Sequence, residues 1–197
     1  MDVVKISSGN SKLGGIWNLS LPPIATCRKD APCVKDCYAM KPYRRFTNVR
    51  IAWMHNLTLW EKAPDQFEAS LIVALSQITR PRFFRWHTAG DIPTQGYLAM
   101  MFRVATACPD INFLAFTKRY EFINNCPDTT PENITIVFSA WPGLKMDNPY
   151  EFQVAWMQDG TEDRVPESAI ECPGHCDECG MCWALDKINK DVVFHKH

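Results

Sequence analysis

The stretch Cys172-Pro-Gly-His-Cys176-Asp-Glu-Cys179-Gly-Met-Cys182 places four cysteines, here called the C-terminal quartet, within eleven residues. The short gaps wrap the chain around a compact object, and the two-residue gaps match those with which bacterial ferredoxins bind a [4Fe–4S] cluster. Structural zinc usually takes two Cys-x-x-Cys pairs a dozen or more residues apart, and the stretch has no such separation. We therefore expect an iron–sulfur cubane, with structural zinc and disulfides as the alternatives.

A second group of cysteines lies near the start of the chain. Cys27, Cys33 and Cys37, here called the N-terminal triplet, have gaps of five and three residues, and Tyr38 follows the last of them. Three thiolates leave one iron of a cubane without a protein ligand, and an open metal position is what a substrate or S-adenosylmethionine binds. Radical S-adenosylmethionine enzymes typically have shorter gaps and an aromatic residue before the last cysteine. The motif therefore leaves a radical mechanism open without indicating it.

The sequence allows two arrangements of these metal-binding loops, 27–37 and 172–182. Either each loop holds its own [4Fe–4S] cluster, or both loops supply ligands to one shared cluster. Cys108 and Cys126 each precede a proline near a predicted element end, and we interpret both as structural thiols that behave as small hydrophobes.

Length and composition predict a soluble protein built as a single α/β domain over residues 1–197, with 46% hydrophobic and 22% charged residues. The sequence has neither a signal-peptide pattern nor a run of 18 apolar residues, so we expect a cytoplasmic protein with no membrane partner. Nine cysteines in a reducing compartment favour metal ligation over disulfides. A net charge of −1 does not indicate nucleic-acid binding; the run Lys41-Pro-Tyr-Arg44-Arg45 is either a local basic patch or a solvated turn.

Hydrophobic periodicity predicts strands that alternate with helices in the middle of the chain. This order is typical of a parallel sheet, and we expect a small partial-barrel-like parallel or mixed sheet with flanking helices and cysteine-rich loops at both ends of the chain. The predicted helices span about 44–62, a segment that starts at Pro64, 94–107 and 183–190; the predicted strands span 82–87, 111–117 and 134–139, with short ones at 3–6 and 16–19.

Polar residues follow three of the predicted strands. His87 and Asp91 follow the first strand, Lys118 follows the second, and Ser139 ends the third. The carboxyl ends of parallel strands open on one side of a sheet, where the binding sites of such folds lie. We therefore take these four as candidate catalytic residues, with structural roles as the alternative for each.

Several short motifs together resemble the phage gene product 88 family, across nearly the whole chain. The more specific ones are Cys37-Tyr38-Ala39 and the Cys-x-x-Cys-x-x-Cys-Trp run that ends at Trp183. The resemblance implies a viral origin and a metallocluster, and it does not supply a reaction. The weaker motifs are Gly9-Asn10-Ser11-Lys12, Leu21-Pro22-Pro23, His87-x-x-Gly90-Asp91 and Phe116-Thr117-Lys118.

Two function classes stay open at this point. In the first, the chain is an iron–sulfur enzyme, similar to radical S-adenosylmethionine enzymes or to hydrolases and desulfidases, that acts on a small molecule or nucleotide at an open iron. In the second, the metal is structural zinc or a redox-sensing cluster, and the protein binds a host or phage partner. The oligomeric state is open in both.

Overall fold

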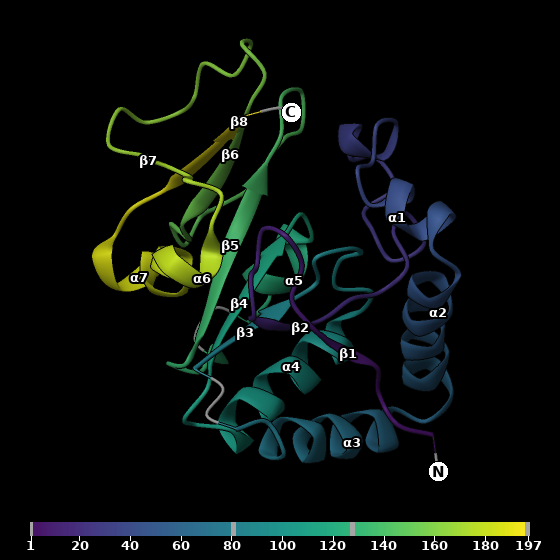
Figure 1. Cartoon of the computed structure of the whole chain (residues 1–197). Coiled ribbons are helices and arrows are strands. Elements are labelled where there is room, and N and C mark those ends of the chain that lie inside the picture. The colour runs from purple at the N-terminus through teal and green to yellow at the C-terminus, as the bar shows by residue number, and fades with distance from the viewer. Residues whose placement is uncertain (1, 80–81, 127–128, 196–197) are drawn as a thin grey trace.

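A computed structural model describes residues 2–79, 82–126 and 129–195 of the chain. Within these residues, eight strands form one open sheet in the order β1-β2-β3-β4-β5-β6-β8-β7 (Figure 1). β1 and β2 are antiparallel, and all the other neighbouring strands are parallel. The strands are β1 (Ile6–Ser8), β2 (Trp17–Leu19), β3 (Phe83–Trp86), β4 (Asn112–Thr117), β5 (Ile134–Ala140), β6 (Val154–Gln158), β7 (Ile170–Glu171) and β8 (Val192–His195).

This mixed, mostly parallel sheet with flanking helices confirms the predicted α/β fold. The three central strands β3, β4 and β5 lie where hydrophobic runs predicted them, to within a residue or so at their ends. The predicted strand at 3–6 is wrong in its position, because β1 begins at Ile6. β6, β7 and β8 were not predicted at all, and the last two residues of the chain, Lys196 and His197, lie outside the described residues.

The helices follow from ordinary start signals. Pro64 opens α3, as expected for a residue whose fixed φ suits the first helical position. The Thr94 side chain accepts a hydrogen bond from the backbone N–H of Tyr97 and caps α4. The helix predicted from about residue 44 is instead two helices, since Phe46 has an extended backbone with φ −113° and ψ 110°. The helices are α1 (Met40–Arg45), α2 (Thr47–Lys62), α3 (Pro64–Ser76), α4 (Gln95–Ala107), α5 (Tyr120–Asn124), α6 (Cys176–Cys179) and α7 (Leu185–Ile188), with 3-10 helices η1 (Pro32–Val34) and η3 (Met181–Ala184).

None of the helices in the described ranges is long and apolar enough to cross a membrane. Apolar side chains instead form two cores, one on each face of the sheet. Successive strand residues point to opposite faces, so β4 sends Phe113 to one core and Leu114 to the other.

The larger core fills the space between the sheet and helices α2, α3 and α4. Trp86 packs edge-on against Tyr97, with ring centroids 6.2 Å apart, and Phe67 lies 5.8 Å from the same tyrosine ring. Full burial of one such aromatic side chain contributes roughly 1.5–3 kcal/mol. This core therefore anchors the helical layer to the sheet.

The smaller core lies on the opposite face, beneath η3 and α7. Trp183 and Leu185 are buried there against Leu114 and Val137 of the central strands. The segment that carries these two residues follows the C-terminal quartet directly. The smaller core consequently fixes one end of that loop to the sheet.

Candidate functional site

The C-terminal quartet lies in a loop that the chain pins at several points. The backbone N–H of Cys172 donates to the Val193 carbonyl, and that of Cys176 donates to the Lys12 carbonyl. Gly180, with φ +60°, ends α6, and a Cβ at this position would lie 3.3 Å from the Phe83 ring. Close packing and a left-handed backbone together favour glycine there.

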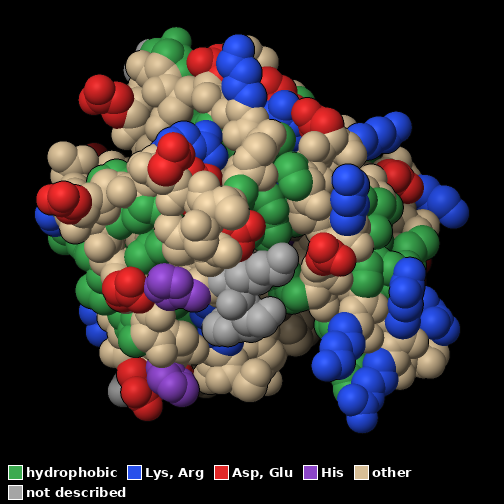
Figure 2. Space-filling model, turned by 90° about the horizontal axis from the view of Figure 1, so that it is seen from above, with side chains coloured by type: hydrophobic (Ala, Val, Ile, Leu, Met, Phe, Trp, Pro, Cys, Tyr) green, Lys and Arg blue, Asp and Glu red, His purple; other side chains and the backbone are tan. Residues whose placement is uncertain are grey.

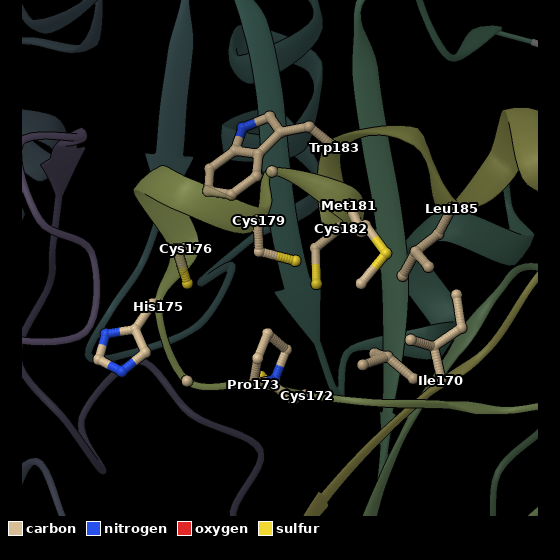
Figure 3. Close-up of a pocket in the computed structure, with 13 residues that line it drawn as sticks. Ile170, Cys172, Pro173, His175, Cys176, Cys179, Met181, Cys182, Trp183 and Leu185 are labelled. Atoms are coloured by element: carbon tan, nitrogen blue, oxygen red, sulfur yellow. The ribbon is translucent and has the colours of Figure 1, made fainter.

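The cysteine side chains of this loop line a common pocket (Figure 3). Figure 3 shows the sulfur atoms of Cys176, Cys179 and Cys182 directed toward its centre, with Cys172 on the far wall. The cavity has a volume of about 20 Å³, which is close to what one water molecule needs. The donor set suits a thiolate-bound metal, but a cubane would require the loop to move outward.

In this conformation, the described residues contain no group of three or more His, Cys, Asp or Glu side chains that could hold a metal ion. The two metal-binding loops and their cofactor therefore stay predictions. A cubane has its ligands at separate iron corners, so its thiolates lie further apart than those around a single zinc ion.

Burial raises the pKa of two thiols in the C-terminal quartet, Cys176 and Cys182, and the positive charge of Arg85 opposes the rise in both. The pKa of Cys182 rises to about 12. Arg85 lies over the Phe116 ring at 4.0 Å, and its Nε–H donates to the Trp86 carbonyl. It forms no ion pair with a carboxylate in the described part of the chain. Arg85 can therefore offset the negative charge of thiolates, a role that its alternating strand position did not reveal.

The N-terminal triplet lies at the carboxyl ends of the strands, in the segment that follows β2. Burial raises the pKa of Cys27 to about 11, and the nearby Asp91 carboxylate raises it further. Burial also raises the pKa of Cys33, while Lys118 lowers it. The structure thus brings the triplet next to Asp91 and Lys118, two of the four candidate catalytic residues.

Asp91 joins the segments that meet at this mouth of the sheet. Its Oδ1 accepts hydrogen bonds from the Thr117 hydroxyl at 2.7 Å and from the Ile92 N–H at 2.8 Å, and its Oδ2 accepts from the Lys118 N–H at 2.9 Å. Its own N–H donates to the Thr26 hydroxyl, beside Cys27. Burial raises the pKa of Asp91, and these hydrogen bonds oppose the rise. Asp91 thereby fixes the triplet's loop to the ends of β3 and β4.

Lys118 and Ser139 form a second polar pair at the same mouth. The Lys118 Nζ donates to the Ser139 hydroxyl at 2.8 Å and lies 5.4 Å from the centre of the Trp141 ring. The Tyr120 hydroxyl donates to the Ser139 carbonyl at 2.6 Å. The pair offers one cation and one hydroxyl to a ligand near the triplet.

His87 is separated from the other three candidates. It has φ +55°, and its ring is buried among Trp86 and Tyr97 on the helical side of the sheet. Its Nε2 lies 3.1 Å from the Tyr97 hydroxyl, and its buried Nδ1 has no hydrogen-bond partner. Burial and the Arg85 charge lower the pKa of His87 to about 3, so the ring is neutral. No cysteine contributes to that shift.

Cys108 and Cys126 lie elsewhere, as part of the rim of the larger core. The Cys126 thiol donates to the Phe122 carbonyl and accepts from the Gln95 amide, each at 3.3 Å. Neither cysteine is among the causes of the raised pKa values of Cys27, Cys33, Cys176 and Cys182. Their position agrees with a structural role.

The fold and these residues define the chain as an α/β protein with one cysteine-rich loop at the mouth of its sheet and another on a sheet face. It belongs to the Gene product 88 family, whose sequence model matches residues 5–185. A curated relative, the Gene 88 protein of Mycobacterium phage L5, is 28% identical over 152 residues, or 68% of this chain and 61% of the relative. No solved structure matches the chain significantly. The family expected from the sequence is confirmed, and its iron–sulfur cluster stays a prediction.

Proposed function

We propose that this chain is an iron–sulfur enzyme with two separate clusters, one held by each cysteine group. The observation that carries the proposal is the position of the N-terminal triplet. It lies beside Asp91 and Lys118 at the carboxyl ends of parallel strands, where folds of this kind hold their reactive groups. A cubane held by three thiolates has an iron free for an exogenous ligand and supports S-adenosylmethionine-dependent radical chemistry or Lewis-acid chemistry.

The protein's own residues support a small anionic ligand at this mouth. Lys118 and Ser139 present a cation and a hydroxyl within 2.8 Å of each other. Asp91 is occupied by three hydrogen bonds to its carboxylate, which favours a positioning role for it over proton transfer. The expected substrate is therefore a small molecule or nucleotide with a carboxylate or phosphate near Lys118.

The separation of the two loops favours two clusters over one shared cluster. Figure 1 shows α6, within the quartet's loop, well away from α1, which directly follows the triplet. Three quartet thiols oppose the fall in the pKa of Arg85, and the three triplet thiols add to the rise in the pKa of Tyr38, so each group of thiols acts on a different side chain. We assign the triplet to the open cluster and the quartet to a fully ligated one.

A second candidate function rests on the small cavity among the quartet's sulfurs. A volume of about 20 Å³ suits a single ion better than a cubane. In that case the quartet holds structural zinc, and the protein is a binding module for a host or phage partner.

Metal analysis after anaerobic purification tests both candidates. We expect about eight irons and as many sulfides per chain, because each cubane carries about four of each. Replacing the triplet with alanine should remove about half of the iron, and replacing the quartet should remove the other half. S-adenosylmethionine should perturb the electron paramagnetic resonance spectrum of the quartet variant and leave that of the triplet variant unchanged.

The control variants are Cys108→Ala and Cys126→Ala, which should keep the full iron content. If the wild type contains about four irons and both the triplet variant and the quartet variant lose all of them, the two groups share one cluster. One zinc per chain without sulfide would refute the enzyme proposal and support the binding module.

A further inference from the structure

One segment carries a net positive charge, although the chain as a whole is nearly neutral. Residues 37–60 contain Lys41, Arg44, Arg45 and Arg50, and all of the acidic residues of the chain lie outside this segment. These four side chains are exposed, and none forms an ion pair within the described ranges. Figure 2 shows Lys and Arg side chains gathered on the side of the molecule where α1 and α2 lie.

The same segment exposes large apolar side chains. Tyr38 is 76% exposed, Phe46 46%, Ile51 62% and Met54 43%. Only two residues of the sixteen-residue helix α2 are fully buried and seven are exposed, so one side of this helix faces solvent while the other packs on the fold. Exposed rings next to unpaired cations are the two components with which proteins bind single-stranded nucleic acid, by base stacking and phosphate contacts.

The geometry holds these groups in place near the mouth of the sheet. The Tyr38 hydroxyl donates to the Thr88 carbonyl, so its ring is fixed at the rim. The Arg45 guanidinium lies 5.4 Å from the centre of the Phe46 ring, beside the break between α1 and α2. Rings that are already positioned lose little conformational entropy when a base stacks on them.

We propose that the surface formed by Tyr38, Lys41, Arg44, Arg45, Phe46 and Arg50 binds single-stranded nucleic acid. Phosphates pair with the Lys and Arg side chains, and bases stack on the exposed rings. The binding is independent of sequence, because neither phosphates nor the faces of bases distinguish one sequence from another. Tyr38 directly follows Cys37, but Arg44, Arg45 and Phe46 lie outside both cysteine loops, so variants at these three positions test the surface without removing a proposed cluster ligand.

Fluorescence anisotropy with a labelled oligothymidylate tests the proposal on the full chain as purified. At about 50 mM salt, we expect binding that weakens steeply as salt increases. Arg44→Ala combined with Arg45→Ala should weaken binding at least tenfold and reduce the salt slope by about 1.4, since each phosphate contact to a single strand contributes about 0.7. Phe46→Ala should weaken binding at least about fivefold through lost stacking.

Each variant has a matched control on another part of the surface. Lys187→Ala combined with Lys190→Ala removes the same charge from exposed positions in and after α7, and Tyr150→Ala removes an exposed ring. Both controls should bind within twofold of the wild type. Circular dichroism checks that all variants keep their fold.

Several results would overturn the proposal. These are no binding by the wild type at low salt, an equal loss in the Lys187 and Lys190 control, or a duplex of the same length that binds as tightly as the single strand. Polyglutamate or phosphatidylserine vesicles that displace the probe as well as unlabelled oligothymidylate would assign the surface to acidic proteins or to membranes instead.

Discussion

At the scale of single residues, His87 is held in a neutral state by its surroundings. Its ring is buried against Trp86 and Tyr97, and its pKa falls to about 3 through burial and the Arg85 charge. A histidine in an unfolded chain titrates near 6.5. Because the folded pKa is depressed, the associated stability is present above pH 6.5 and is lost as the pH falls toward 3.

We therefore expect acid to weaken the fold through His87. This residue should contribute a loss of about 1.4 kcal/mol in the free energy of unfolding for each pH unit below about 6. His87→Asn keeps a side chain that tolerates positive φ and removes this titration. Urea unfolding of both proteins from pH 7 to pH 4 measures the difference, and equal pH slopes would show that His87 is not buried in solution.

The sequence identified four candidate catalytic residues, but it could not predict which of them lie together in the folded chain. Polar residues after apolar runs are visible in any sequence, so Asp91, Lys118 and Ser139 could be found at the strand ends. The direction of the His87 ring depends on its φ of +55°, which no local pattern specifies. Arg85 was not among the candidate residues, because its role depends on the quartet's loop, which packs near it only in the folded chain.

At the scale of elements, the turn between β3 and α4 packs directly on the segment that leads from β2 to the N-terminal triplet. The Leu21 N–H donates to the Ala89 carbonyl, and the Thr26 hydroxyl accepts from the Asp91 N–H. Gly90 lies between these contacts with φ +80°, and a Cβ there would come within 2.6 Å of the Thr26 hydroxyl and 2.9 Å of the Leu21 carbonyl. The close approach of two backbones leaves no room for a side chain.

Gly90→Ala should consequently displace the triplet's loop. Gly143→Ala is the matched control, because Gly143 also has positive φ, at +77°, and a Cβ there would meet nothing within 4 Å. The control carries only the left-handed strain of about 1–2 kcal/mol, and Gly90→Ala should destabilise the fold by clearly more. It should also lose about half of the iron. Similar unfolding free energies and iron contents in the two variants would contradict this packing.

The sequence predicted those helices and strands whose residues form an apolar run or a helix start within the element itself. β3, β4 and β5 are apolar runs bounded by turns, and α3 and α4 carry a proline start and a threonine cap. β8 inserts between β6 and β7, so these short strands are stabilised by pairing with distant segments. Pairing of this kind leaves little trace in the local sequence.

At the scale of the whole molecule, the two cysteine loops are integrated into the fold to different degrees. The quartet's loop continues into Trp183, whose indole N–H donates to the Phe84 carbonyl at 3.0 Å and whose own carbonyl accepts from the Thr135 hydroxyl at 3.1 Å. Trp183 and Leu185 then fill the smaller core. The triplet's loop contains η1, which has no buried residue.

Loss of metal from the quartet should therefore lower the stability of the fold more than loss of metal from the triplet. Metal binding contributes folding free energy. The triplet's loop can become disordered without exposing a core, whereas the quartet's loop is continuous with Trp183 in the smaller core. Without metal at the quartet, the adjoining face of the sheet loses the constraint that holds Trp183 against it, so the quartet-to-alanine variant should unfold several degrees below the triplet-to-alanine variant. Anaerobic differential scanning calorimetry of the two variants and the wild type measures this order. A triplet variant with the lower Tm would mean that the mouth of the sheet, rather than the face beneath η3, depends most on its metal.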